Sequence, residues 1–123
     1  MTFSRGDTFL MGPLDEYHLN VVVTDPTANG EVVIVPVTTL RPRTRDRLFI
    51  LNEGDHPFIK HPSAIACSFA QISLLGRLLA LAASKTILPR EPLPKDLAQR
   101  IAEALLESDF TENGVKHFLR EGR

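Results

Sequence analysis

Residues 31–39 read Glu-Val-Val-Ile-Val-Pro-Val-Thr-Thr, which is the strongest strand-like run in the sequence. β-Branched side chains lose rotamer freedom in a helix and pack well on a pleated surface, so the run predicts a strand. Residues 25–30, Asp-Pro-Thr-Ala-Asn-Gly, form a strong turn signal before it, and residues 21–23 are all valine. The two apolar runs therefore predict a β-hairpin. Pro36 has no N–H for the ladder, so we expect an edge position or a bulge there.

Other short apolar runs surround this hairpin. They predict further strands over residues 6–10, 48–51 and 63–72, with the first strand of the hairpin over 17–24. No helical pattern separates these strands, which argues for a small barrel or sandwich rather than a parallel sheet. We expect about five strands in this small barrel or sandwich.

Helical spacing begins after residue 73. Apolar residues recur every three or four positions over 74–83 and again at Leu97, Ile101 and Leu105, which predicts two helices, the second over residues 95–107. Prolines between residues 89 and 94 separate them, and a third, shorter helix is expected to begin near Thr111. The expected class is mainly β with two or three C-terminal helices (α+β). The 123 residues are expected to form one domain, with residues 1–72 as the β part and 73–123 as a helical extension packed on it.

The composition limits the classes of function. Hydrophobic residues make up 43% of the chain, and 14 basic against 15 acidic residues give a net charge of −1, so the overall charge indicates neither a nucleic-acid nor a membrane partner. The longest apolar stretch falls short of the roughly 20 residues that a membrane span needs, and the N-terminus lacks the apolar segment of a signal peptide. The single cysteine, Cys67, lies in an apolar context and is expected to be a small buried residue. We therefore expect a soluble, reduced, cytoplasmic protein without a membrane partner.

The order of several segments resembles the PemK/MazF family of bacterial toxins. The resemblance covers roughly residues 5–73 and is carried by the start Gly6-Asp7-Thr8-Phe9, by the strands at 21–24 and 33–38, and by Ser63-Ala64-Ile65 leading to Ala70-Gln71-Ile72. Members of that family are small SH3-like barrels, usually homodimeric. They cleave single-stranded RNA without a metal and are neutralised by an antitoxin.

The resemblance also implies site residues, with one departure. The catalytic threonine of the family falls on Thr38, and the serine that opens its late strand falls on Ser63. The catalytic arginine is missing, because its Arg-Pro pair matches His18-Leu19 here. This change removes a permanent cation that would stabilise a pentacoordinate phosphate, so the usual mechanism cannot transfer unchanged.

Histidines supply an alternative for the chemistry. His56 and His61 lie five residues apart in a proline-punctuated segment, and imidazole both takes and gives protons near neutral pH. The expected catalytic set is His18, Thr38, His56, His61 and Ser63. The expected RNA-binding set is Thr39, Arg41, Arg43, Arg45 and Lys60, because an extended loop over 41–47 would point its arginines to one side. No aromatic residue alternates with these arginines, so that loop does not predict base stacking.

Plainer interpretations stand beside these. A His-Pro pair is often part of a turn, threonines at a strand end can reflect β-propensity, and an arginine run can be a solvated face. Three imidazoles can hold zinc, but their spacing matches no strong metal signature, so no metal or cofactor is expected. The function is then either a toxin-like endoribonuclease, or a descendant of one, or a non-catalytic SH3-like module that binds a peptide or nucleic acid. Single-stranded RNA, a cognate antitoxin and a second copy of the chain are the expected partners.

Overall fold

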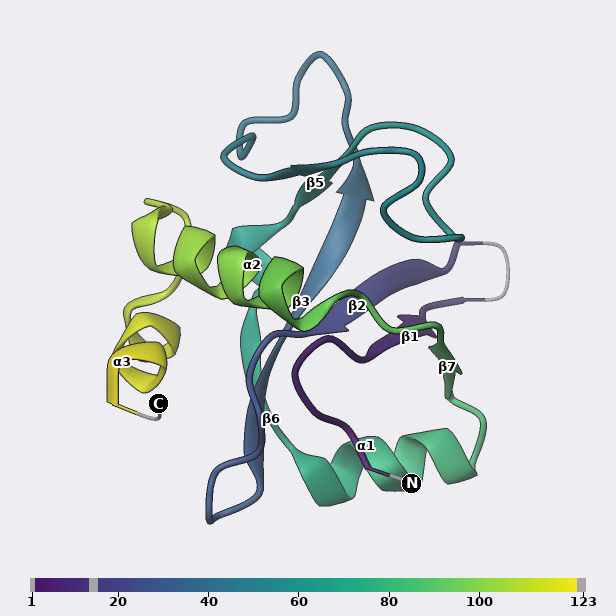
Figure 1. Ribbon diagram of the computed structural model, residues 1–123, viewed down its shortest axis with the longest axis vertical. Coiled ribbons are helices and arrows are strands. Elements are labelled where there is room, and N and C mark those ends of the chain that lie inside the picture. The colour runs from purple at the N-terminus through teal and green to yellow at the C-terminus, as the bar shows by residue number, and fades with distance from the viewer. Residues whose placement is uncertain (1, 14–15, 122–123) are drawn as a thin grey trace.

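A computed structural model describes residues 2–13 and 16–121 of the chain. Seven strands form one antiparallel sheet in the order β4-β5-β3-β2-β1-β7, with β6 beside the first half of β3 (Figure 1). The strands are β1 (Thr8–Met11), β2 (His18–Val22), β3 (Glu31–Thr39), β4 (Ile50–Leu51), β5 (Ser63–Ile65), β6 (Gln71–Leu74) and β7 (Ile87–Arg90). The helices are α1 (Leu75–Ala83), α2 (Lys95–Glu107) and α3 (Asn113–Glu121), and a 3-10 turn, η1, spans Cys67–Phe69.

The mainly β, α+β class predicted from the sequence is confirmed, but the barrel is not. The sheet ends at β4 on one side and β7 on the other, and these two strands do not pair within the described part of the chain. The number of strands also exceeds five, because η1 divides the strand expected over residues 63–72 into β5 and β6. The seventh strand, β7, lies between the first two expected helices, where the sequence predicted no strand.

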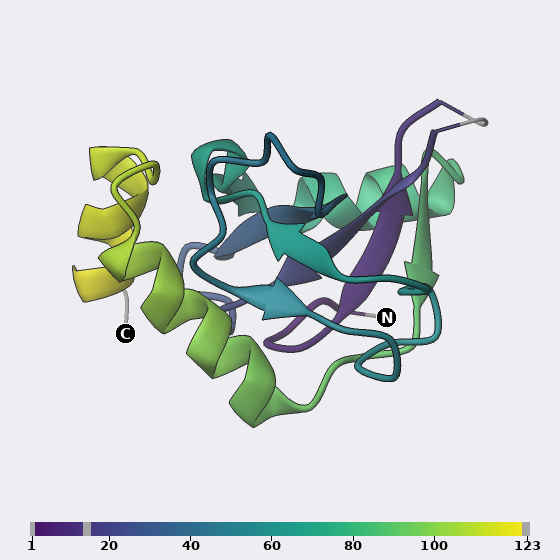
Figure 2. The same cartoon turned by 90° about the horizontal axis from the view of Figure 1, so that it is seen from above.

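Both faces of the sheet are covered. On β3, the odd-numbered Val33, Val35 and Val37 belong to a core cluster shared with α2 and α3, whereas Val32 and Ile34 belong to a second cluster shared with α1. Figure 2 shows α1 on one side of the sheet and α2 on the other. A strand that is buried on both faces carries a continuous apolar run rather than an alternating one, which explains the composition of residues 32–37.

The expected hairpin is confirmed, with β2 and β3 antiparallel around the turn at residues 25–30. The expected edge position of Pro36 is wrong, because β3 lies between β2 on one side and β5 and β6 on the other. Pro36 is tolerated at the point where β3 changes neighbours, after its last pair with β6 at Ile34 and before its first pair with β5 at Val37. Its carbonyl accepts a hydrogen bond from the N–H of Ala66 at 3.0 Å, so its missing donor also faces this break.

The helices follow their sequence patterns closely. Helix α2 has the predicted bounds, and Ile101 and Leu105 are fully buried against the sheet. Helix α3 begins two residues after Thr111 and buries Val115 and Leu119. None of the helices in the described ranges has the length and apolar character needed to cross a membrane.

Candidate functional site

A cavity of about 760 Å³ lies where β2 and β3 separate. The pairing of these strands stops at Asn20 and Pro36. Beyond that point the first residues of β2 stay with β1, and the last residues of β3 stay with β5. The two strand pairs, β1 with β2 and β3 with β5, therefore diverge, and the loop over residues 57–61 closes the opposite side of the space.

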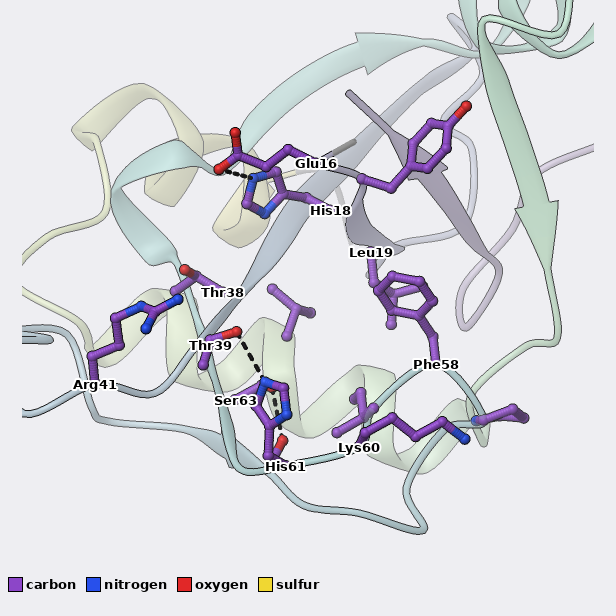
Figure 3. Close-up of a pocket in the computed structure, with 14 residues that line it drawn as sticks. Glu16, His18, Leu19, Thr38, Thr39, Arg41, Phe58, Lys60, His61 and Ser63 are labelled. Carbon is purple, nitrogen blue, oxygen red and sulfur yellow. Dashed lines mark hydrogen bonds and ion pairs between the residues drawn. The ribbon is translucent and has the colours of Figure 1, made fainter. Parts of the chain in front are cut away.

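Most of the expected site residues line this cavity, although they come from separate segments. His18 begins β2, Thr38 and Thr39 end β3, and His61 and Ser63 lie at the start of β5. Figure 3 shows His18 and His61 on opposite sides, with the two threonines between them. The expected residues that line it are His18, Thr38, Thr39, Arg41, Lys60, His61 and Ser63.

Hydrogen bonds fix one side of the cavity. Nε2 of His61 lies 3.1 Å from Oγ1 of Thr39, and either atom can be the donor. The hydroxyl of Ser63 donates to the carbonyl oxygen of His61 at 3.0 Å, which ties the histidine backbone to β5. Ser63 is buried in the cavity wall, and this bond holds the backbone of His61 in place. On the other side, Oε1 of Glu16 lies 4.0 Å from Nε2 of His18, an ion pair when the ring is protonated.

His56 does not join the other histidines. It is 3% exposed and lies outside the cavity lining. Its Nδ1 accepts a hydrogen bond from the N–H of Phe58 at 3.0 Å, so the ring proton is on Nε2, which donates to the carbonyl oxygen of Glu91 at 2.7 Å. Oγ1 of Thr8 lies 3.2 Å from the same Nε2 and donates to the same carbonyl. The expectation of a catalytic His56 is replaced by a structural one: the ring joins β1, the loop at 57–61 and the segment after β7.

The arginine loop is folded rather than extended, which corrects the expected row of cations. The N–H of Arg41 donates to Oγ1 of Thr44, and the N–H of Thr44 donates to the carbonyl oxygen of Arg41. The guanidinium of Arg47 donates to that same carbonyl at 3.0 Å. As a result, Arg41 lines the main cavity, Arg43 is exposed outside it, and Arg45 lines a separate cavity of about 310 Å³.

The loop that carries Lys60 and His61 is held at several points. Oδ2 of Asp55 accepts a hydrogen bond from the N–H of Asn52 at 2.7 Å, which confirms the turn role expected for this aspartate. Ile59 is 4% exposed and belongs to the core cluster of α2. Because Ile59 is anchored inward, Lys60 and His61 follow it to the exposed rim of the cavity.

Sequence reasoning missed the apolar wall of the cavity. Tyr17, Leu19 and Phe58 line it together with the polar residues, and Figure 3 shows Phe58 beside Leu19. The available signal was an aromatic residue between the two histidines, in a loop otherwise rich in polar residues and proline. Aromatic side chains that are 41% exposed, as Phe58 is, commonly serve recognition.

Cys67 is fully buried in η1, as expected. Burial raises the pKa of its thiol to about 11, with a smaller contribution in the same direction from the nearby carboxylate of Asp46. A thiol with such a pKa is not a nucleophile at neutral pH. Within residues 2–13 and 16–121, no group of three or more histidine, cysteine, aspartate or glutamate side chains is arranged to hold a metal ion.

Comparisons with known proteins do not extend this description. No protein-family model matches the chain, and no curated protein sequence matches it significantly.

Proposed function

We propose that the chain is an endoribonuclease of the PemK/MazF type, or a descendant of one, that cleaves single-stranded RNA without a metal. The observation that carries the proposal is the gathering of His18, Thr38, Thr39 and His61 around one cavity of about 760 Å³. These residues come from two strands and a loop, and local turn formation does not explain why they line one cavity. Two imidazoles and two hydroxyls are a sufficient set for proton transfer and phosphate contact.

The reaction would be attack of a 2′-hydroxyl oxygen on the adjacent phosphorus. One imidazole takes the hydroxyl proton as the new P–O bond forms, and the other gives a proton to the departing 5′ oxygen as the old bond breaks. The products are a 2′,3′-cyclic phosphate and a 5′-hydroxyl. Attacking and leaving oxygens lie roughly in line through phosphorus, which suits an acid and a base on opposite sides of a cavity, as His18 and His61 are in Figure 3.

Charge on the non-bridging oxygens needs donors and cations. The hydroxyls of Thr38 and Thr39 lie between the imidazoles and would donate hydrogen bonds there. Arg41 and Lys60 on the rim would contact flanking phosphates and replace part of the charge lost with the family arginine. A homodimeric assembly and neutralisation by a cognate antitoxin belong to the same proposal and rest on the resemblance alone.

Cleavage by the purified protein tests the proposal. A single-stranded RNA is incubated in excess EDTA, and the products are analysed for cyclic phosphate ends. We expect cleavage by the wild type and a loss of 10²-fold or more in His18→Ala and in His61→Ala. His117→Ala is the matched control, because His117 is an exposed histidine on α3 outside the cavity. An RNA with 2′-deoxyribose at the scissile position should stay intact, and wild-type rates in both histidine variants would contradict the proposal.

A non-catalytic binding module is the second candidate, and two observations favour it. Nε2 of His61 already has Thr39 as a partner, and position 18 carries histidine where the family has arginine. The same experiment separates the candidates. RNA that binds to the wild type and is recovered intact indicates the module, whereas cyclic phosphate products indicate the enzyme.

A further inference from the structure

A second cavity adjoins the first one where β2 and β3 separate, and it lies toward the face of the sheet that α1 covers. It measures about 410 Å³ and lies between the ends of β2 and β3 and the turn η1. His18, Val37 and Thr38 line both cavities. The two spaces therefore share the side chains of His18 and Thr38 at the gap between β2 and β3, and we call them together the groove.

An exposed aromatic ring stands at each end of this groove. Phe58 is 41% exposed in the first cavity, and Phe69 is 70% exposed in the second. Apolar neighbours support both rings, with Leu19 beside Phe58 and Met11 in the cavity of Phe69. Proteins that bind single-stranded nucleic acids stack the bases on exposed aromatic rings of this kind.

The charged groups are distributed unevenly along the groove. Arg41 and Lys60 line the first cavity, and Glu16 is its acidic residue among those described. Among the residues that the structure describes, the second cavity is lined by no charged group other than His18 when that ring is protonated. Cations therefore stand beside the Phe58 end, where a polyanion would continue, and the Phe69 end favours an uncharged planar group.

We infer that the groove holds two successive nucleotides of a single strand. The phosphate between them lies at His18 and Thr38, one base stacks on Phe58, and the other stacks on Phe69. The inference rests on the proposed function and deepens it, because it places the scissile phosphate where the cavities meet and makes base stacking at both ends a requirement for binding.

Tyr17 offers a direct probe of binding. It is the only tyrosine of the chain, the chain has no tryptophan, and Tyr17 lines the first cavity. Tyrosine fluorescence of the whole protein therefore reports on this site alone. The ligand is a tetranucleotide with 2′-O-methyl groups throughout, which cannot be cleaved, compared with the same backbone carrying abasic positions in the middle.

Four substitutions define the expected result. Phe58→Ala and Phe69→Ala should each weaken binding of the base-bearing tetranucleotide by about 5- to 150-fold, the range seen when a stacked base loses its aromatic partner. Phe110→Ala is the control, because Phe110 is 44% exposed but lines a different cavity near α2. Phe58→Leu, which keeps the apolar volume and removes the ring, should fall with Phe58→Ala. Far-UV circular dichroism verifies that each variant is folded.

Each outcome has a definite meaning. Quenching of Tyr17 by the base-bearing ligand, with weaker binding of the abasic ligand and of both phenylalanine variants, supports the two subsites. Equal binding of base-bearing and abasic ligands, or wild-type affinity in Phe58→Ala and Phe69→Ala, overturns the inference and leaves the RNA-binding proposal standing. If neither ligand binds at millimolar concentration and long RNA is neither bound nor cut, both the inference and the proposed function are refuted.

Discussion

Replacing His56 separates a structural histidine from the candidate catalytic ones. The His56→Ala variant removes the acceptor for the N–H of Phe58 and a donor to the carbonyl oxygen of Glu91, both in partly buried hydrogen bonds. Leaving a buried polar group without a partner costs about 1–3 kcal/mol, and the vacated volume adds to that cost. The carbonyl of Glu91 keeps the hydroxyl of Thr8, so the N–H of Phe58 carries most of the penalty. We expect the free energy of unfolding to fall by about 2–4 kcal/mol.

Urea unfolding followed by circular dichroism measures this change. For a chain of this size 1 kcal/mol corresponds to about 4 °C, so a thermal scan should show a midpoint about 8–16 °C lower. Asparagine at position 56 can keep an acceptor near Nδ1, and glutamine can keep a donor near Nε2, so His56→Asn and His56→Gln should each retain part of the stability. His61→Ala is the contrasting variant, since His61 is exposed and its removal should change stability by less than about 0.5 kcal/mol.

The two histidines should therefore behave in opposite ways. At a temperature where it is fully folded, His56→Ala should still cleave RNA, within about tenfold of the wild type, because it touches the cavity only through the backbone of Phe58. His61→Ala should keep its stability and lose cleavage. A His56→Ala protein with wild-type stability and no cleavage would refute the reasoning and return His56 to the catalytic set.

Three further predictions address the thiol, the backbone and the charges. The thiol of Cys67 has its ordinary pKa of 9.0 in the unfolded chain, and burial raises the pKa to about 11 in the folded protein. The contribution of this thiol to the free energy of unfolding is therefore complete below pH 9 and is lost as the pH rises toward 11. Over that range the free energy of unfolding should fall by about 2–3 kcal/mol more in the wild type than in Cys67→Ala. Gly6→Ala should lower the free energy of unfolding by about 2–4 kcal/mol, because φ is +98° and the new Cβ would lie 2.7 Å from a backbone oxygen. Gly54→Ala has a φ of +100° but open space around the new Cβ, so in the same urea unfolding assay it should cost about 1 kcal/mol. In RNA binding measured against salt, Arg41→Ala should reduce the slope of log K against log salt by about 0.7 and Arg43→Ala should leave it unchanged; equal effects would indicate that the folded loop does not decide which arginine is used.

The sequence predicted those parts of the fold in which a local pattern agrees with the tertiary structure. The four-residue spacing of Leu97, Ile101 and Leu105 located α2 to its observed bounds, because one face of that helix is buried against the sheet. The β-branched run located β3 for the same reason. Strand β7 was missed because Pro89 lies inside it, and proline argues against a strand unless that strand lies at an edge or a break in the pairing. Strand β7 is such an edge, with β1 as its neighbour in the sheet. Whether a strand is an edge is a property of the whole sheet.

The fate of the paired histidines shows a second limit of local reasoning. His56 and His61 have the same neighbour, a proline, and lie in the same loop, yet one is buried and the other is exposed. The partners that decide this are distant in sequence: Glu91 lies 35 residues from His56, and Thr8 lies 48 residues from it. A pattern of residue types cannot distinguish two imidazoles whose environments are set by different strands.

The two threonines at the end of β3 explain how one strand serves both halves of the groove. Successive side chains of a strand point to opposite faces, so Thr38 and Thr39 cannot face the same space while β3 is paired on both sides. Beyond Pro36 the strand has lost β2, and both residues reach the cavity. Thr38 lines both cavities, as His18 does, whereas Thr39 lines only the first and contacts His61. The separation of β2 from β3 therefore places a threonine hydroxyl near each of the two imidazoles. If β3 stayed paired with β2 to its end, Thr38 and Thr39 would point to opposite faces of the sheet, and only one of the two hydroxyls could reach the first cavity.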